Sequence, residues 1–444
     1  MATRLIKTQG TGTSTKKFTF STWIKKSSNT TDHDQVIYGS YNDGNNRITL
    51  YFTSNKLALY VAVSGSTIGA FTTNRLFRDT NAWYHVVLAV DTTLGTSSDR
   101  IKLYVNGTQE TSFASTTYPS QDAVLPTGSS SYQHALGYYS GGGSSAFIGY
   151  LSHPAYCDGT ALTPTSFGST DSTSGIWKFK PPSGFTFGNN GFHLKFENSG
   201  NLGLDSSGEG NNFTTSTGTP IQVLDTPSNN HATIDALYKN SATYTYGNLK
   251  SSNASNKFGG VATIGVSTGK WYAEFKYGSN SNQYGAVGIY GDPEPASKAN
   301  QGVGKQTNSY SYRSDAYKLI ENSDSSYGST YGNGDIVGIA VDLDNNKLYF
   351  SKNGVWQNSG VPTSGSTGTG AIPISLTSNT GFWFIAANSN SGSNTAVWEH
   401  NYGNGYFGAT AITSAGSNGN GSLFEYDVPS GYYALNTKNL NSYG

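Results

Sequence analysis

The sequence predicts an all-β protein built from two tandem β-sandwich (jelly-roll) modules, and three observations support this prediction. Only 12% of the 444 residues are charged, while 13% are aromatic and 55 are glycine. Such a composition favours strands over helices. Short apolar segments separated by turn residues recur along the chain, as they do in sandwiches and jelly rolls. Finally, one pair of strands occurs twice in a similar form.

This repeated pair is the clearest local signal. Residues 83–91 form an apolar segment that ends in Asp, and residues 100–107 alternate and end in Asn-Gly. Residues 334–342 and 347–354 follow the same scheme. Asn-Gly supplies the positive φ angles that a tight type I′ turn needs. One architectural unit therefore occurs twice, which indicates two domains and points to binding rather than chemistry.

The remaining expected strands follow from apolar alternation. In residues 18–24, Phe18, Phe20 and Ile24 share one face with Thr22, and Trp23 lies on the other. Turn residues separate this segment from the other expected strands, and those strands from one another. Further strands are expected at 48–52, 56–63, 147–151, 260–265, 270–276, 285–290 and 381–386.

Composition shifts divide the chain into four parts. We expect a first sandwich over residues 1–168 and a second over 232–428. Residues 169–231 are rich in Gly, Ser, Asn and Pro, and we interpret them as an ordered connector in which only 192–196 and 221–224 could be strands. Residues 429–444 form a C-terminal tail.

Charge and cysteine content limit the function. A net charge of zero gives no steering toward nucleic acid. Cys157 is the single cysteine, so the chain has no disulfide framework and no cysteine-based zinc site. No segment approaches the roughly 18 apolar residues of a membrane span, so membrane insertion is not expected.

The N-terminal residues point to a particular location. They contain no apolar stretch of signal-peptide length, so we expect synthesis in a cytoplasm without export by the general secretory route. The uncharged, tyrosine-rich composition is nevertheless typical of extracellular binding proteins. A virion that assembles in the host cytoplasm and is released by lysis reconciles the two observations.

The second module resembles the SPRY domain. The resemblance lies in residues 269–275, 310–315, 334–344 and 347–354, and it covers most of 245–400. It implies a two-sheet sandwich that binds partners through loops at one end. By this resemblance Trp356, directly after the Asn353-Gly354 turn, is a candidate rim residue for partner binding.

The first module is similar to laminin-G-like, concanavalin-A-like jelly rolls. The similarity lies in residues 18–24, 83–90, 103–107, 149–151 and 158–164. Together with the connector segments, the order of the modules resembles virion structural proteins of tailed bacteriophages, especially marine ones. The resemblance implies a tail fibre or adhesin, or a capsid-surface decoration protein, present in multiple copies or as a homo-oligomer.

Two catalytic motifs occur without their structural context. Residues 265–269 match G-x-S-x-G, but the segment that follows reads as a strand and not as the helix of a nucleophile elbow. Residues 403–408 match G-x-G-x-x-G, but no helix of useful length follows. Glycosidases of this fold need two facing carboxylates. Glu274 and Glu399 are isolated, so we predict no catalytic residue and no enzyme activity.

One acidic cluster could bind a cation. Asp32 and Asp34 flank His33 in a loop, and Asp43 could approach them. Ca²⁺ prefers carboxylate and carbonyl oxygens, and laminin-G-like domains often bind calcium. The alternative is a solvated turn, and no other cofactor is expected.

Exposed aromatic residues are the main binding candidates. Tyr41, Tyr132, Tyr138 and Tyr139 fall in stretches rich in Gly, Ser and Asn, where side chains tend to be exposed. Large, rigid, amphipathic rings suit sugar faces and protein partners. By contrast, other aromatic residues lie within strands and are expected in the core or in structural roles, namely Trp23, Trp83, Trp271, Trp383, Tyr310, Tyr312 and Tyr317.

Three functions remain open at this point. The first is a non-enzymatic phage virion protein that binds host cell-surface glycan or neighbouring virion proteins, for host attachment or decoration. The second is a carbohydrate-active enzyme with lectin-like modules, against which the lack of paired carboxylates argues. The third is a cellular SPRY interaction protein, against which the scarcity of charge and of helical partner domains argues.

Overall fold

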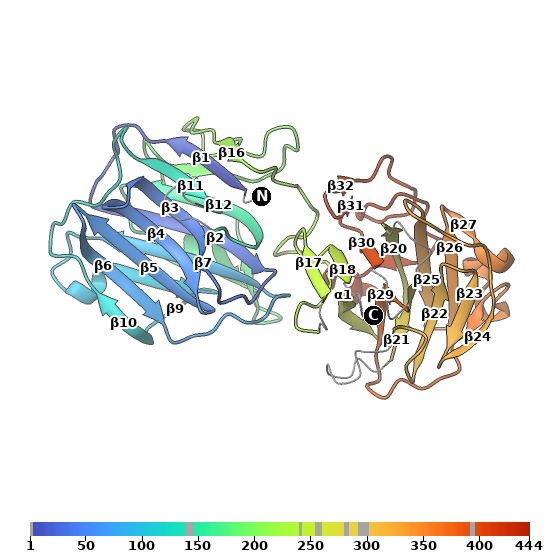
Figure 1. Cartoon of the computed structure of the whole chain (residues 1–444). Coiled ribbons are helices and arrows are strands. Elements are labelled where there is room, and N and C mark those ends of the chain that lie inside the picture. Colours follow the sequence, from blue (N-terminus) through green and yellow to red (C-terminus); the bar gives the residue numbers. More distant parts are fainter. Residues whose placement is uncertain are drawn as a thin grey trace. The chain divides into compact units, whose positions relative to one another are not determined.

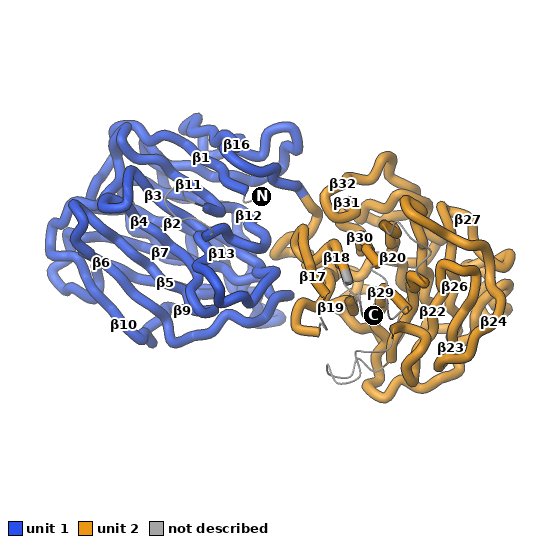
Figure 2. Tube along the Cα trace, in the orientation of Figure 1, with its two compact units in different colours: residues 1–222 blue, residues 223–444 orange. Residues whose placement is uncertain are grey.

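The chain forms two compact units, residues 1–222 and 223–444 (Figure 2). Both are nearly all β, as the sequence predicts, and the described residues contain one α-helix, α1 (Thr437–Tyr443). In the parts of the chain that are described, no helix has the length and hydropathy to cross a membrane. The computed structural model describes residues 3–138, 145–238, 242–253, 260–278, 284–291, 302–390 and 396–444.

Unit 1 is a sandwich of an eight-stranded and a six-stranded sheet, both antiparallel (Figure 1). The first sheet runs in the order β10 (Phe113–Thr117), β6 (Ser66–Thr73), β5 (Lys56–Val63), β4 (Asn46–Thr53), β3 (Gln35–Asp43), β11 (Gln133–Leu136), β1 (Arg4–Thr8) and β16 (Thr214–Thr217). The second runs β15 (Phe192–His193), β12 (Gly149–Asp158), β2 (Lys17–Lys26), β7 (Trp83–Asp91), β8 (Ile101–Val105) and β9 (Thr108–Gln109). A small pair, β13 (Gly168–Thr170) and β14 (Trp177–Phe179), is added to these.

The core of unit 1 lies between the two sheets, and β2 contributes to it as predicted. Phe18, Phe20 and Ile24 are all at most 1% exposed. The Phe20 ring stacks on Tyr38 of the facing sheet, with centroids 4.2 Å apart. Trp23 points away from this core and stacks on His85 at 4.8 Å. Each such buried side chain stabilises the fold by roughly 1.5–3 kcal/mol.

Both Asn-Gly turns have the expected conformation. Asn106 and Gly107 have φ angles of 49° and 81°, and Asn353 and Gly354 have 47° and 79°. Positive φ at both central residues is the signature of a type I′ turn. The turns join β8 to β9 in unit 1 and β26 (Lys347–Lys352) to β27 (Val355–Trp356) in unit 2.

The predicted ordered connector, residues 169–231, is divided between the units: residues 169–222 belong to unit 1 and 223–231 to unit 2. His193 pairs with Ala155 of β12, and β16 pairs with β1. Phe192 and Phe213 are at most 3% exposed and lie in the core of unit 1. Widely spaced aromatic residues bury this segment although most of its backbone is turn and loop.

The described residues of unit 2 form a nine-stranded and a six-stranded sheet. The first has the main order β17 (Ala242–Thr245), β18 (Lys250–Asn253), β30 (Ala396–Asn401), β20 (Lys270–Tyr277), β25 (Ile336–Asp342), β26 and β27, with β28 (Ile372–Pro373) beside β26 and β33 (Tyr433–Ala434) beside β20. The second runs β19 (Val261–Val266), β29 (Trp383–Ser389), β21 (Gly285–Tyr290), β22 (Ser309–Arg313), β23 (Tyr317–Ile320) and β24 (Ser323–Ser326). A two-stranded pair, β31 (Tyr406–Phe407) and β32 (Thr410–Ala411), completes the unit.

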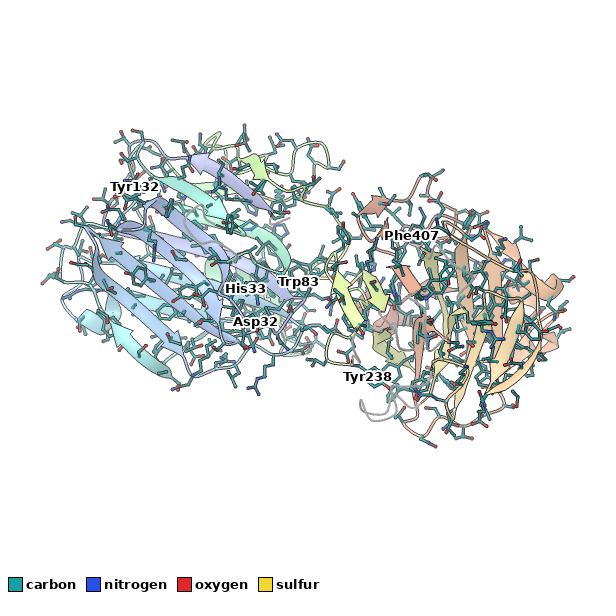
Figure 3. The ribbon with its side chains drawn as sticks, viewed as in Figure 1. Asp32, His33, Trp83, Tyr132, Tyr238 and Phe407 are labelled. Atoms are coloured by element: carbon teal, nitrogen blue, oxygen red, sulfur yellow. The ribbon has the colours of Figure 1, made fainter. Side chains whose placement is uncertain are left out.

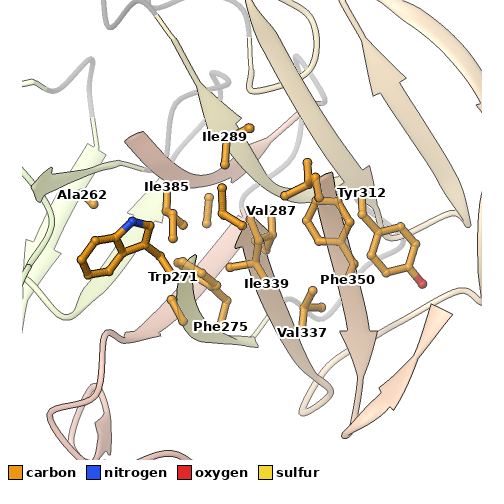
Figure 4. Packing of buried hydrophobic residues seen from close by; sticks show 14 of the residues in the cluster. Ala262, Trp271, Phe275, Val287, Ile289, Tyr312, Val337, Ile339, Phe350 and Ile385 are labelled. Atoms are coloured by element: carbon orange, nitrogen blue, oxygen red, sulfur yellow. The ribbon is translucent and has the colours of Figure 1, made fainter. Parts of the chain in front are cut away.

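The core of unit 2 is formed by both large sheets (Figure 4). Trp271 and Phe275 of β20 and Ile289 of β21 are fully buried in it. Residues 429–444, expected as a tail, also pack into this unit. Tyr433 pairs in parallel with Trp271, and Leu435 is fully buried.

Candidate functional site

The outer face of the eight-stranded sheet in unit 1 carries a row of tyrosines. Side chains alternate along a strand, so when Leu50 and Phe52 of β4 enter the core, their neighbour Tyr51 faces outward. The same alternation places Tyr60 of β5 and Tyr41 of β3 on the outer face. We define the tyrosine face by Tyr41, Arg47, Tyr51, Tyr60 and Gln133, all of which are partly exposed.

Strand register brings these side chains together. Tyr41 lies opposite both Arg47 and Gln133 on the neighbouring strands. The Arg47 guanidinium carbon lies 4.9 Å from the centre of the Tyr60 ring, which is a cation–π contact. Between the large residues the face carries small ones, namely Gly39, Ala58, Ala62, Ala70 and Ala135. Ala58, Ala62 and Ala135 are at most 3% exposed, so a ligand would contact the large side chains and not the sheet beneath them.

Tyr132 and Asp43 lie at the end of β3 and β11 where Tyr41 is found. The pKa of the Tyr132 hydroxyl is raised, first by burial and then by the charge of Asp43. Asp43 Oδ1 accepts hydrogen bonds from Asn45 N at 2.7 Å and from Asn46 Nδ2 at 3.2 Å. The bond from Asn45 N is the main cause that lowers the pKa of Asp43. This carboxylate therefore shapes the β3–β4 turn.

Among the predicted tyrosines that the structure describes, Tyr138 does not join this group. Tyr132 precedes the first residue of β11 and Tyr138 follows its last, so the two tyrosines lie at opposite ends of this strand. Tyr139 lies outside the described residues. Of the described residues in the predicted set, Tyr41 and Tyr132 therefore lie near one another and Tyr138 does not.

The structure does not bring the three candidate calcium ligands together. Asp34 precedes β3 and Asp43 ends it, so about 30 Å of extended backbone separates them. Figure 3 shows Asp32 well away from Tyr132, which lies at the Asp43 end. Within the described ranges, no three His, Cys, Asp or Glu side chains are grouped to hold a metal ion.

In unit 2 an aromatic pair encloses an arginine. The Arg313 guanidinium carbon lies 4.9 Å from the Tyr284 ring centre and 5.6 Å from that of Tyr317. Both rings are exposed, at 44% and 39%. Asp315 accepts two hydrogen bonds from Arg313 at 2.7 Å, and Asp324 accepts one at 3.2 Å. The bidentate pair holds the guanidinium in place between the rings.

Comparison with known proteins agrees with this architecture. Residues 3–166 match the family model described as the concanavalin A-like lectin/glucanases superfamily, and residues 255–385 match the model of the SPRY domain. The chain carries a concanavalin A-like module followed by a SPRY domain. No curated protein matches the chain.

Several solved structures are similar to part of the chain. The SPRY domain of human HERC1 is 15% identical, with a TM-score of 0.28, over 36% of this chain and 92% of that one. A heptameric SAP-like pentraxin from Limulus polyphemus is 19% identical, with a TM-score of 0.27, over 36% and 72%. A human SPRY domain is 16% identical, with a TM-score of 0.24, over 38% and 96%.

Within the SPRY domain, Trp356 is only partly exposed. Its ring lies 6.4 Å from that of the fully buried Tyr272, in an edge-on arrangement. Tyr310 and Tyr312 are buried in the core, as expected, whereas Tyr317 is exposed. Trp356 therefore contributes to packing as well as to the surface.

The isolated glutamates have structural partners. Glu274 is fully buried and accepts hydrogen bonds from Glu425 N at 2.7 Å and Tyr426 N at 2.9 Å. Burial raises its pKa to about 7. Glu399 pairs with Lys250 at 2.7 Å. Residues 265–269, the G-x-S-x-G match, join strand β19 directly to strand β20, so the helix of a nucleophile elbow is missing there.

The sequence reasoning missed Arg47, Tyr51 and Tyr60 because it looked for exposed aromatic residues in loops. Their outward orientation can be predicted from the alternation of inward- and outward-facing side chains along each strand. Tyr51 stands between the core residues Leu50 and Phe52, and so must face outward.

Proposed function

We propose that this protein is a non-enzymatic virion structural protein, a tail fibre or adhesin or a capsid-surface decoration of a tailed phage. In this proposal the concanavalin A-like module binds host-surface glycan and the SPRY domain binds a neighbouring virion protein. The tyrosine face carries the proposal. Both modules are of binding type.

The chemistry of the tyrosine face suits a sugar chain. Tyrosine rings provide rigid apolar surfaces with a polar tip. Arg47 and Gln133 supply hydrogen-bond donors for hydroxyl groups, and Gln133 also supplies an acceptor. Ala58 and Ala62 lie between these side chains and are fully buried, so a sugar would stack on the rings and not reach the sheet beneath them. The combination favours an uncharged glycan with alternating apolar and hydroxyl faces.

The Tyr284–Arg313–Tyr317 cluster supports the protein-binding role of the SPRY domain. Tyrosine and arginine are enriched where interfaces derive most of their binding energy. Asp315 and Asp324 fix the arginine, so little side-chain entropy is lost when a partner binds.

A glycan array probed with the full chain tests the sugar-binding role. We expect Tyr51→Ala and Tyr60→Ala to weaken binding several-fold each, since a stacked aromatic contributes about 0.5–1.5 kcal/mol. The control is Tyr246→Ala, which removes a 49% exposed tyrosine of unit 2. Equal glycan binding by all variants, or release of reducing sugars from host polysaccharide, contradicts the proposal.

The virion role is tested separately. An antibody against the chain should label the surface of purified particles whose genome encodes it, as seen by electron microscopy. Absence of the chain from such particles by mass spectrometry contradicts this part, whatever the glycan array shows.

A further inference from the structure

Two histidines of unit 1 face one another across neighbouring strands. His153 lies in β12 and His193 in β15, which pair through Ala155 and His193. The register of β12 against β2 shifts between Ser152 and Ala155, so His153 lies in a β-bulge. Its φ of 51° is unusual for a residue other than glycine. Bulges of this kind redirect a side chain, and strained backbone of this kind is concentrated at functional sites.

The two rings are held in position before any ligand binds. His153 Nδ1 lies 3.2 Å from His193 Nε2. The His153 ring stacks on Phe179 with centroids 3.8 Å apart, and the His193 ring lies parallel to Phe187 at 6.3 Å. The backbone N–H of His193 donates to Asp205 Oδ1 at 2.9 Å, which fixes β15 at this point.

The distance between the two nitrogens matches the distance expected between two histidine nitrogens that bind the same transition metal ion. Zinc binds histidine nitrogens at about 2.0–2.1 Å, and tetrahedral geometry then places two such nitrogens about 3.3 Å apart. We propose that His153 Nδ1 and His193 Nε2 form a binding site for a divalent transition metal ion of the zinc type. Without metal the same nitrogens share a hydrogen bond, whose proton moves to the other nitrogen of its own ring when metal binds.

The site would have open coordination positions. No third His, Cys, Asp or Glu joins the pair within the described residues. Water or a partner group therefore completes the coordination shell, and affinity is lower than at a structural zinc site with four protein ligands. The metal would join β12 to β15 and so stabilise unit 1.

Calorimetric titration of the full chain with ZnCl₂, after treatment with EDTA and desalting, tests the site. We expect one zinc ion per chain, lost in both His153→Gln and His193→Gln. His33→Gln is the matched control, because His33 lies in the loop before β3 and takes no part in the pair. We also expect zinc to raise the melting temperature of the wild type and His33→Gln but not of the two pair variants.

A spectrum of the wild type with Co²⁺ gives a readout that does not depend on the folding of a variant. Strong visible absorption, typical of tetrahedral cobalt, supports the site if the EDTA-treated chain takes up one equivalent. Failure of the EDTA-treated chain to retain one equivalent of Co²⁺ or Zn²⁺ in equilibrium dialysis overturns the proposal. Zinc binding that is unchanged in folded His153→Gln and His193→Gln also overturns it, and the histidine pair is then only a hydrogen bond.

Discussion

Asn106 and Asn353 perform the same structural task in the two units. Asn106 Oδ1 accepts a hydrogen bond from His85 N at 2.8 Å, and Asn106 N donates to His85 O at 2.9 Å. Asn353 makes the same pair of bonds with Ile336, both at 2.8 Å. Each asparagine thus adopts positive φ in its turn, and its side chain bonds to the neighbouring strand beside the last β7–β8 or β25–β26 backbone pair.

Asn106→Val and Asn353→Val should each destabilise the protein by about 2 kcal/mol or more. Valine at positive φ is strained, and the side-chain hydrogen bond, which contributes about 1 kcal/mol, is lost. Urea denaturation followed by circular dichroism measures the change. Asn106→Gly and Asn353→Gly are the controls, because glycine keeps the backbone conformation and loses only the hydrogen bond. Valine variants as stable as the wild type would contradict the double role.

Limited proteolysis should cut first within residues 218–224. These residues have no regular structure and lie at the boundary between the units. Within the predicted connector, Phe213 is buried and β16 pairs with β1, so residues 213–217 should resist cleavage although the β16 side chains are exposed. Mass spectrometry should therefore find two stable pieces that meet near 222. A stable N-terminal piece that ends near 168 would show that residues 169–222 are not integrated into unit 1.

Glu274 should make stability depend on pH. Burial raises its pKa in the folded state to about 7, whereas the unfolded value is 4.5. The unfolded state therefore ionises first, and the stability contributed by the neutral carboxyl is present below pH 4.5 and is lost as pH rises to about 7. A shift of this size corresponds to about 3 kcal/mol.

The free energy of unfolding, measured in urea at pH 5 and pH 7.5, tests this. Burial lowers the pKa of histidines such as His85 and His400 to about 3, so they stay neutral in the folded state and take up protons on unfolding within this pH range. The difference between wild type and Glu274→Gln in pH dependence separates Glu274 from these histidines. Glu399→Gln is the control, since Glu399 is paired with Lys250 near the surface. If Glu274→Gln and the wild type change in parallel with pH, Glu274 is ionised throughout.

The fold was predictable where side chains alternate. Phe18, Phe20 and Ile24 indicate a buried face from their spacing alone, and Asn-Gly indicates the turns. The assignment of residues 169–222 to unit 1 was not predictable from the sequence. Phe192 and Phe213 are isolated among turn residues, and only the folded chain shows what they pack against.

The candidate sites depend even more on tertiary structure. Tyr51 and Tyr60 could be found from alternation, but the partner of Tyr60, Arg47, follows from strand register. His153 and His193 are 40 residues apart, and a bulge that no local pattern announces turns one toward the other.

Glycan binding should tolerate salt and should depend on the tyrosine face. The chain has no net charge, and stacking and hydrogen bonds are not screened by ions as charge pairs are. Affinity for a glycan found on the array should therefore change little between low and high salt. Tyr51→Ala and Tyr60→Ala should weaken it, whereas Tyr138→Ala should not, because Tyr138 lies at the far end of β11 from Tyr132. Binding that falls steeply with salt would indicate a charged ligand. Loss of binding in Tyr138→Ala alone would move the site from the tyrosine face to the opposite end of the strand.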